Sequence, residues 1–141
     1  MGMLVSSSFG STPLVLVVDD DQNSRQGIAE YLLGAGYRVS EAADGPEALG
    51  KALRRRPDIV LLDLAIPKLD GWTVARTLKA DPGLASVPVI AFSAFDYPNE
   101  RARAADAGCD AFLAKPCALD QLLEIIKRLL TLRVTGGVAR A

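Results

Sequence analysis

Of the 141 residues, half are hydrophobic and 23% are charged, which supports one buried core and leaves little room for a second domain. Sixteen basic and seventeen acidic residues give a net charge of −1, which indicates neither a nucleic-acid surface nor a polybasic membrane patch. The chain has no histidine, which excludes Ser-His-Asp and Cys-His catalysis and His-ligated metal sites.

The beginning of the chain predicts a tail, a buried strand and an amphipathic helix. Residues 1–12 are unpatterned and lack the basic and apolar regions of a signal peptide, so we expect a flexible tail. The run Leu14–Val18 is wholly apolar and mostly β-branched, as in a strand that is buried on both faces. A helix follows, with apolar residues at i, i+3, i+4 and i+7 from Ile28, and we expect Gly34 and Gly36 to help to end it.

The next segments repeat this alternation of strand and helix. Tyr37–Ala42 predicts a second strand. Asp44–Pro46 is placed to open a helix, since proline is tolerated in a first turn, and Leu49 and Leu53 share one face of it. Pro57 ends that helix.

A third strand is expected at Asp58–Leu62, another continuous apolar run. The loop at residues 63–71 leads into a helix that carries Val74 and Leu78. The turn-forming residues Asp81–Gly83 then break that helix.

The last part of the chain adds two strands and two helices. Val87–Phe92 and Ala111–Ala114 are the strands, and the alanine-rich Asn99–Ala107 forms a helix between them. A final helix begins at Leu119 with apolar residues at clean helical spacing. Residues 132–141 contain Gly-Gly and predict a second flexible tail.

Alternating buried strands and amphipathic helices predict an α/β fold, a parallel sheet with helices on both faces. Right-handed crossovers make a doubly wound arrangement the natural one. We therefore expect a single domain over residues 13–131.

Polar residues follow four of the predicted strands, at the point where each strand ends. They are Asp19, Asp20, Asp21, Asp63, Ser93 and Lys115. In an open parallel sheet the carboxyl ends of the strands meet at one edge, where ligands bind. We therefore expect carboxylates, a hydroxyl and an ammonium to converge.

Each of these residues alone has an ordinary structural interpretation. Asp21 is more readily a helix cap or a solvated neighbour, Ser93 a turn hydroxyl and Lys115 a surface lysine. Convergent carboxylates repel one another, however, so a divalent cation and Lys115 are the expected balancing charges. A cation held by few protein oxygens is typical of Mg²⁺.

Four motifs in this order resemble the receiver domain of two-component response regulators over residues 13–131. They are Val-Leu-Val-Val-Asp-Asp-Asp, Asp-Leu-Ala-Ile-Pro-Lys-Leu-Asp-Gly, Ser-Ala after an apolar strand, and Lys-Pro. The resemblance implies a flavodoxin-like (CheY-like) fold with strand order 2-1-3-4-5.

The resemblance also implies roles for individual residues. Asp63 matches the phosphoacceptor, and Asp19 and Asp20 match the acidic pair that holds Mg²⁺ together with Asp63. The backbone carbonyl of Ala65 matches a further metal ligand.

The remaining matched positions belong to phosphate binding and switching. Ser93 matches the residue whose hydroxyl turns toward the phosphoryl group, and Ala94 follows it as a further phosphate-binding position. Lys115 matches the lysine that pairs with the phosphoryl oxygens. The Lys115–Pro116 peptide bond is expected to be cis, and Phe112 matches the aromatic switch residue.

By this resemblance the chain accepts a phosphoryl group from a sensor histidine kinase or a histidine phosphotransfer protein and then changes its partner-binding surface. That surface is expected on the fourth helix, fifth strand and fifth helix. We expect a cytoplasmic protein, a monomer or a weak phosphorylation-dependent dimer, without direct contact to nucleic acid or membrane. It would catalyse only its own phosphorylation and autodephosphorylation.

Three rival functions are less consistent with the residues. A phosphorylation-independent pseudo-receiver is the main alternative, although all the matched positions are filled. A phosphoaspartate hydrolase would need a second catalytic Asp where Ala65 stands. A transcription factor would need an output domain after residue 131.

Several residues depart from the family pattern or carry separate expectations. Phe95 is hypothesised to shield the phosphoryl group. Cys109 and Cys117 form no disulfide or metal motif and are expected to be buried, reduced thiols. The run Arg54–Arg56 is expected to be solvated at a helix end, with docking as the weaker alternative.

Overall fold

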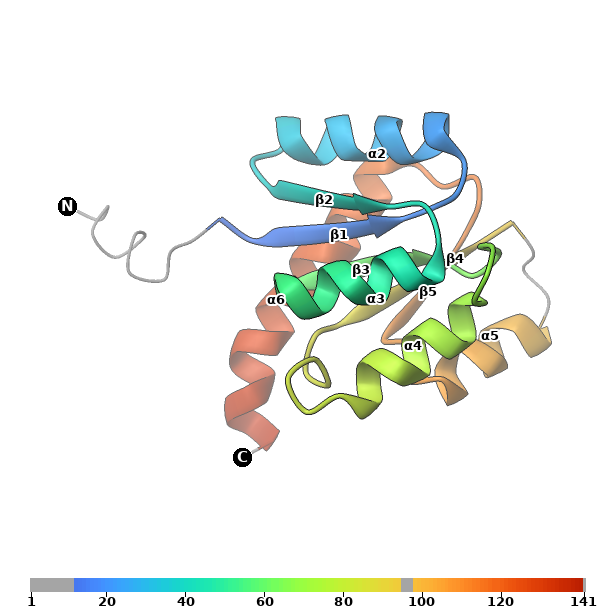
Figure 1. Ribbon diagram of the computed structural model, residues 1–141. Coiled ribbons are helices and arrows are strands. Elements are labelled where there is room, and N and C mark those ends of the chain that lie inside the picture. Colours follow the sequence, from blue (N-terminus) through green and yellow to red (C-terminus); the bar gives the residue numbers. More distant parts are fainter. Residues whose placement is uncertain (1–11, 95–97, 141) are drawn as a thin grey trace.

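The computed structural model describes residues 12–94 and 98–140, and side chains up to residue 132 except Pro98. Five parallel strands form one sheet in the order β2-β1-β3-β4-β5, which confirms the predicted strand order (Figure 1). The strands are β1 (Leu14–Val18), β2 (Arg38–Ala42), β3 (Ile59–Asp63), β4 (Val89–Ser93) and β5 (Ala111–Ala114). The helices are α2 (Gln22–Gly34), α3 (Gly45–Arg54), α4 (Gly71–Ala80), α5 (Pro98–Asp106) and α6 (Leu119–Arg140).

The helices cover both faces of the sheet, α2 and α6 on one and α3, α4 and α5 on the other (Figure 1). Successive strand residues point to opposite faces, so each central strand contributes to two cores. In β3, Ile59 and Leu61 pack with α2 and α6, whereas Val60 and Leu62 pack with α3 and α4. This explains why the sequences of the central strands β1, β3 and β4 are almost continuously apolar rather than alternating.

Aspartates cap the amino ends of the three helices that follow the first three strands. Asp21, Asp44 and Asp70 each accept a hydrogen bond from the backbone N–H three residues later. These contacts satisfy donors that the first helical turn leaves free, and they determine where each helix begins.

The prediction that Leu49 and Leu53 form the apolar face of α3 was wrong in part. Leu53 is 64% exposed, whereas Ala48 and Ala52 are buried. The small alanines allow the α3 backbone to lie close to the sheet, and Leu49 packs only at the edge of that core. Helical spacing fits both pairs equally well, so the pattern could not distinguish them.

The carboxyl end of α6 differs from the predicted tail at residues 132–141. The helix continues to Arg140 through Gly136 and Gly137. Glycine within a helix costs about 1 kcal/mol relative to alanine but does not remove the backbone hydrogen bond, so it does not by itself end a helix. Of the tail predicted at residues 1–12, only Thr12 is described, and Phe95 also lies outside the described residues.

The two cysteines are less buried than expected. Cys109 and Cys117 are free but half-buried rather than fully buried, and burial raises the pKa of the Cys109 thiol to about 11.

No helix in the described part of the chain combines the length and apolar character needed to cross a membrane.

Gly27 offers a simple test of helix packing. It lies exposed inside α2, and a Cβ added there meets nothing within 4 Å. Because glycine loses more backbone entropy on folding than alanine, Gly27→Ala is expected to raise the unfolding free energy by about 0.5–1 kcal/mol. Urea denaturation measures this change, and a destabilised variant would mean that α2 is packed differently.

Candidate functional site

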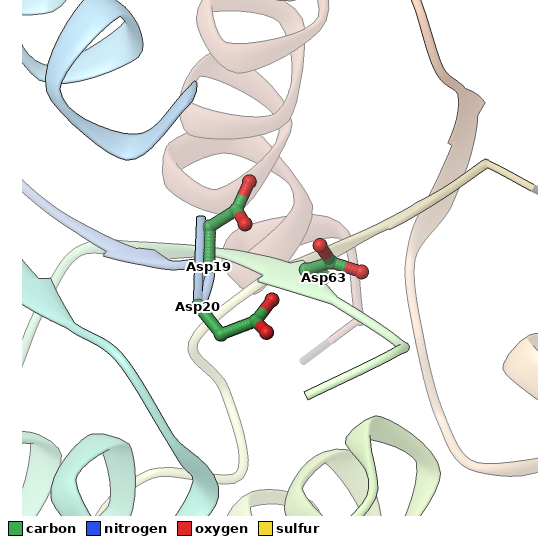
Figure 2. Close-up of side chains that lie close together, drawn as sticks. All are labelled: Asp19, Asp20 and Asp63. Atoms are coloured by element: carbon green, nitrogen blue, oxygen red, sulfur yellow. The ribbon is translucent and has the colours of Figure 1, made fainter. Parts of the chain in front are cut away.

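The carboxyl edge of the sheet brings three carboxylates together. Asp19 and Asp20 follow β1, and Asp63 ends the neighbouring β3 (Figure 2). One oxygen from each carboxylate lies within 4.8 Å of one from each of the others. Asp19 and Asp63 are buried, whereas Asp20 is exposed. The cluster is therefore a partly enclosed acidic site that opens to solvent at Asp20.

Asp63 is held on both of its oxygens. Lys115 Nζ donates to Oδ2 at 2.8 Å, and the Ala65 N–H donates to Oδ1 at 2.9 Å. Burial raises the pKa of Asp63, and these two hydrogen bonds act in the opposite direction. The carboxylate is thus oriented by its neighbours, and the residue is only 5% exposed.

Lys115 connects the end of β5 to the acidic cluster. Its backbone N–H donates to the Ser93 carbonyl at 2.7 Å, and the Lys115–Pro116 peptide bond is cis. Its ammonium contacts Asp19 Oδ2 at 3.0 Å as well as Asp63. Burial of the ammonium opposes its charge, but the hydrogen bonds to Asp63 and Asp19 outweigh burial and raise the pKa of Lys115. Lys115 therefore stays charged and balances two buried carboxylates.

Ser93 and Ala94 lie beside this cluster at the end of β4. Ser93 is 1% exposed, and Ala94 is exposed at the surface. Phe112 is half-buried on β5 opposite Ala91, and the Arg101 guanidinium lies 4.6 Å from the centre of its ring. The sheet thus places Asp19, Asp20, Asp63, Ser93 and Lys115 at the carboxyl ends of adjacent strands, whereas Phe112 lies within β5.

Asp21 and the arginine run have structural roles in the described contacts. Asp21 caps α2 through the Ser24 N–H at 2.9 Å, which confirms its interpretation as a cap. Arg54 and Arg55 are exposed at the end of α3. Arg56 donates to the Gly83 carbonyl and the Ser86 hydroxyl, so it ties the segment after α3 to the loop before β4.

Two glycines, Gly71 and Gly45, pack closely against the loop that follows Asp63. A Cβ built on Gly71 would lie 2.5 Å from Leu64 Cα and 2.9 Å from the Asp63 carbonyl oxygen. A Cβ on Gly45 would lie 2.6 Å from Leu69 Cβ. Only residues without a side chain fit at these points, so both glycines determine where this loop lies.

Arg25 contacts the site and Glu41 contacts Arg25, and neither residue was identified from the sequence. Arg25 on α2 donates to the Asp19 carbonyl at 2.7 Å and to Glu41 Oε1 at 3.0 Å. A cation near the amino end of a helix is disfavoured by the helix dipole. The presence of Arg25 at this position was therefore a sequence signal for a specific contact. Glu41 had no comparable signal in the sequence.

The donor set fits a hard divalent cation. Carboxylate oxygens are the ligands that Mg²⁺ prefers, and it commonly binds through one or two of them with water completing its coordination. The Asp20 carboxylate forms no hydrogen bond or ion pair with another described residue, so it is available as a ligand. Asp19, Asp20 and Asp63 could hold such an ion.

The chain matches the family model of the response regulator receiver domain over residues 15–127. It is 41% identical over 116 residues to the response regulator MprA of Mycobacterium sp. strain KMS, which covers 82% of this chain and 50% of that protein. It is 34% identical over 118 residues to the DNA-binding dual master transcriptional regulator RpaA of Synechocystis, which covers 84% and 49%. The chain spans about half the length of these curated relatives.

Solved structures agree with these relationships. The Vibrio cholerae chemotaxis protein CheY4 superposes with a TM-score of 0.81 at 29% identity, covering 84% of this chain and 99% of that one. The receiver domain of sensor histidine kinase PA1611 from Pseudomonas aeruginosa superposes with a TM-score of 0.80 at 33% identity, covering 86% and 99%. The latter structure has a magnesium ion coordinated in the active-site cleft.

Proposed function

This chain belongs to the response regulator receiver domain family, and we propose that it is a phosphorylation switch whose acceptor is Asp63. The observation that carries the proposal is the position of Asp63: a buried carboxylate held by Lys115 at 2.8 Å, beside two further aspartates. No other carboxylate in the described cluster ends a strand in this way.

The reaction would place one Asp63 oxygen on phosphorus while the donor's leaving group departs. Phosphoryl transfer passes through a loose transition state that needs positioning and charge neutralisation more than a strong nucleophile. The Ala65 N–H fixes Asp63 Oδ1, and Lys115 holds Oδ2 and supplies positive charge near the incoming phosphoryl oxygens.

Mg²⁺ would be held by Asp19, Asp20 and Asp63, with the Ala65 carbonyl as the further ligand. When bound, it would neutralise charge on the phosphoryl oxygens. The magnesium in the related PA1611 receiver domain supports this assignment.

The phosphoryl donor is proposed to be a phosphohistidine on a sensor kinase or a phosphotransfer protein, since this chain contains no histidine. The new charge would draw the Ser93 hydroxyl inward, and Phe112 would move with it. This would alter the surface of α5, β5 and α6, where a downstream partner would bind. The catalysis would be confined to the chain's own phosphorylation and autodephosphorylation.

A phosphorylation-independent pseudo-receiver is the alternative, but the geometry does not favour it. A pure binding module has no need of a lysine that balances two buried carboxylates. Breaking such a pair is costly, and keeping it confers little stability over an apolar replacement.

The test is incubation of the purified chain with acetyl phosphate, with Mg²⁺ or with a chelator, followed by intact-protein mass spectrometry. We expect one phosphoryl adduct that requires Mg²⁺ and disappears in Asp63→Asn. Asp63→Asn keeps the size of the side chain but removes the anionic nucleophile.

Asp21→Asn is the matched control, because the Asp21 side chain caps α2 and the substitution keeps the backbone N–H that donates to Asp19. It should form the adduct as the wild type does. Absence of any adduct on a folded wild type that binds Mg²⁺ would favour the pseudo-receiver instead.

A further inference from the structure

The two proposed metal ligands that follow β1, Asp19 and Asp20, differ in how many contacts hold them. Asp19 is fixed at four points: its N–H donates to the Ala42 carbonyl, its carbonyl accepts from Arg25, and its carboxylate accepts from Asp21 N–H and Lys115. The Asp20 carboxylate, by contrast, forms no hydrogen bond or ion pair with another described residue. Asp20 must therefore be positioned through its backbone.

The carbonyl of Asp19 and the N–H of Asp20 belong to the same planar peptide unit. Arg25 Nη1 donates to that carbonyl oxygen at 2.7 Å, so it determines the orientation of the peptide plane and of the bond that carries the Asp20 side chain. The Arg25 side chain is only 16% exposed, which limits competition by water for this contact.

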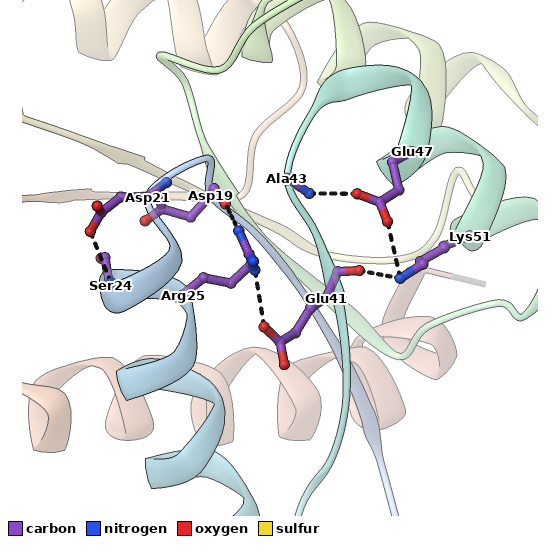
Figure 3. A network of polar contacts seen from close by, with 8 residues as sticks. All are labelled: Asp19, Asp21, Ser24, Arg25, Glu41, Ala43, Glu47 and Lys51. Carbon is purple, nitrogen blue, oxygen red and sulfur yellow. Dashed lines mark hydrogen bonds and ion pairs between the residues drawn. The ribbon is translucent and has the colours of Figure 1, made fainter.

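Glu41 orients the arginine. Its Oε1 accepts from Arg25 Nε at 3.0 Å, so the planar guanidinium bridges β2 and the end of β1 (Figure 3). The Glu41 carbonyl in turn accepts from Lys51 Nζ, which also pairs with Glu47 Oε2 at 3.3 Å (Figure 3). Glu47 Oε1 accepts from the Ala43 N–H, which closes the network onto the loop after β2.

We propose that Arg25 is a positioning residue for the metal site, and that Glu41 holds it in place. Arg25 touches neither the metal oxygens nor the acceptor carboxylate. It fixes the peptide between Asp19 and Asp20, so that the Asp20 carboxylate already faces the site before Mg²⁺ binds. This inference rests on the proposed function, because it assigns Asp20 to the metal.

A residue that only stabilises the fold would have a different effect from a positioning residue. Removing a structural contact lowers the unfolding free energy and leaves the Mg²⁺ affinity of the folded protein unchanged. Removing a positioning contact weakens the affinity itself, and groups that orient metal ligands typically contribute about 10–100-fold.

The experiment is calorimetric titration of Mg²⁺ into the folded protein, with urea denaturation in chelator as a parallel measurement. We expect Arg25→Met to weaken Mg²⁺ binding by at least about 10-fold. Arg25→Lys keeps the charge but cannot bridge both acceptors in one plane, so it should restore only part of the affinity. Glu41→Ala leaves the arginine and should cause a smaller loss in the same direction.

Arg54→Met is the matched control, because it removes one exposed arginine at the end of α3, away from the acidic cluster. Its Mg²⁺ affinity should equal that of the wild type. If Arg25→Met is folded and binds Mg²⁺ as the wild type does, the positioning role is wrong. If Arg25→Met does not fold, an unchanged affinity in both Arg25→Lys and Glu41→Ala would overturn the proposal.

The outcomes separate this inference from the proposed function. A wild type that binds no Mg²⁺ and forms no phosphoryl adduct contradicts the proposed function. A wild type that does both, beside an Arg25→Met variant of equal affinity, contradicts only the role of Arg25.

Discussion

Lys115→Met is expected to destabilise the protein by about 3–5 kcal/mol in the presence of a chelator. The ammonium lies 2.8 Å from Asp63 and 3.0 Å from Asp19, and both carboxylates are buried. Methionine preserves most of the apolar stem but leaves two buried negative charges without a cation. Urea denaturation with and without Mg²⁺ measures the loss.

Mg²⁺ should restore more stability in Lys115→Met than in the wild type, because the metal becomes the main balancing charge in the cluster. The pH dependence has a defined sign. Burial already raises the pKa of Asp63, and removing the ammonium raises it further, so the folded state binds a proton more readily than the unfolded chain. The variant should therefore gain stability as the pH falls through the folded pKa.

Lys68→Met is the matched control for this substitution. Lys68 pairs with Asp44 at 3.2 Å, but its side chain is 67% exposed. Exposed ion pairs contribute about 0–1 kcal/mol, so this variant should lose little. A Lys115→Met protein as stable in chelator as the wild type would contradict the assignment of Lys115 as the balancing charge.

Gly71→Ala is expected to destabilise the protein by about 1–3 kcal/mol and to slow formation of the phosphoryl adduct. The added methyl group would lie 2.5 Å from Leu64 Cα and 2.9 Å from the Asp63 carbonyl oxygen. Both are backbone atoms, which cannot rotate away as a flexible side chain can. The Asp63–Leu64 backbone at the end of β3 must therefore shift, and the Asp63 carboxylate would move with it.

The same substitution at Gly27 provides the matched control, since its Cβ meets nothing within 4 Å. The two variants should change the urea midpoint in opposite directions, and Gly27→Ala should form the adduct at the wild-type rate. If Gly71→Ala matched the wild type in both stability and adduct formation, the close approach of Gly71 to the Asp63–Leu64 backbone would not determine the position of Asp63.

Some parts of this protein could be predicted from the sequence because they depend on local patterns. The apolar runs of β1 and β3 indicate strands buried on both faces, and their alternation with helices predicts a doubly wound parallel sheet. The observed strand order was implied by the resemblance to receiver domains. The acidic residues that directly follow these strands lie at the same sheet edge for the same reason. Asp21 was correctly interpreted as a cap, because its role depends on residues within one turn.

Tertiary structure determined the features that depend on contacts between residues far apart in the sequence. Helical spacing allowed either Leu53 or the pair Ala48 and Ala52 to face the sheet, and only packing against the strands showed that the small residues are buried. The contact of Arg25 with the Asp19 carbonyl requires the geometry of two separate elements. The sequence by itself therefore determined which chemical groups gather at the sheet edge. The packing determined how they are held, because contacts between distant residues leave no periodic pattern.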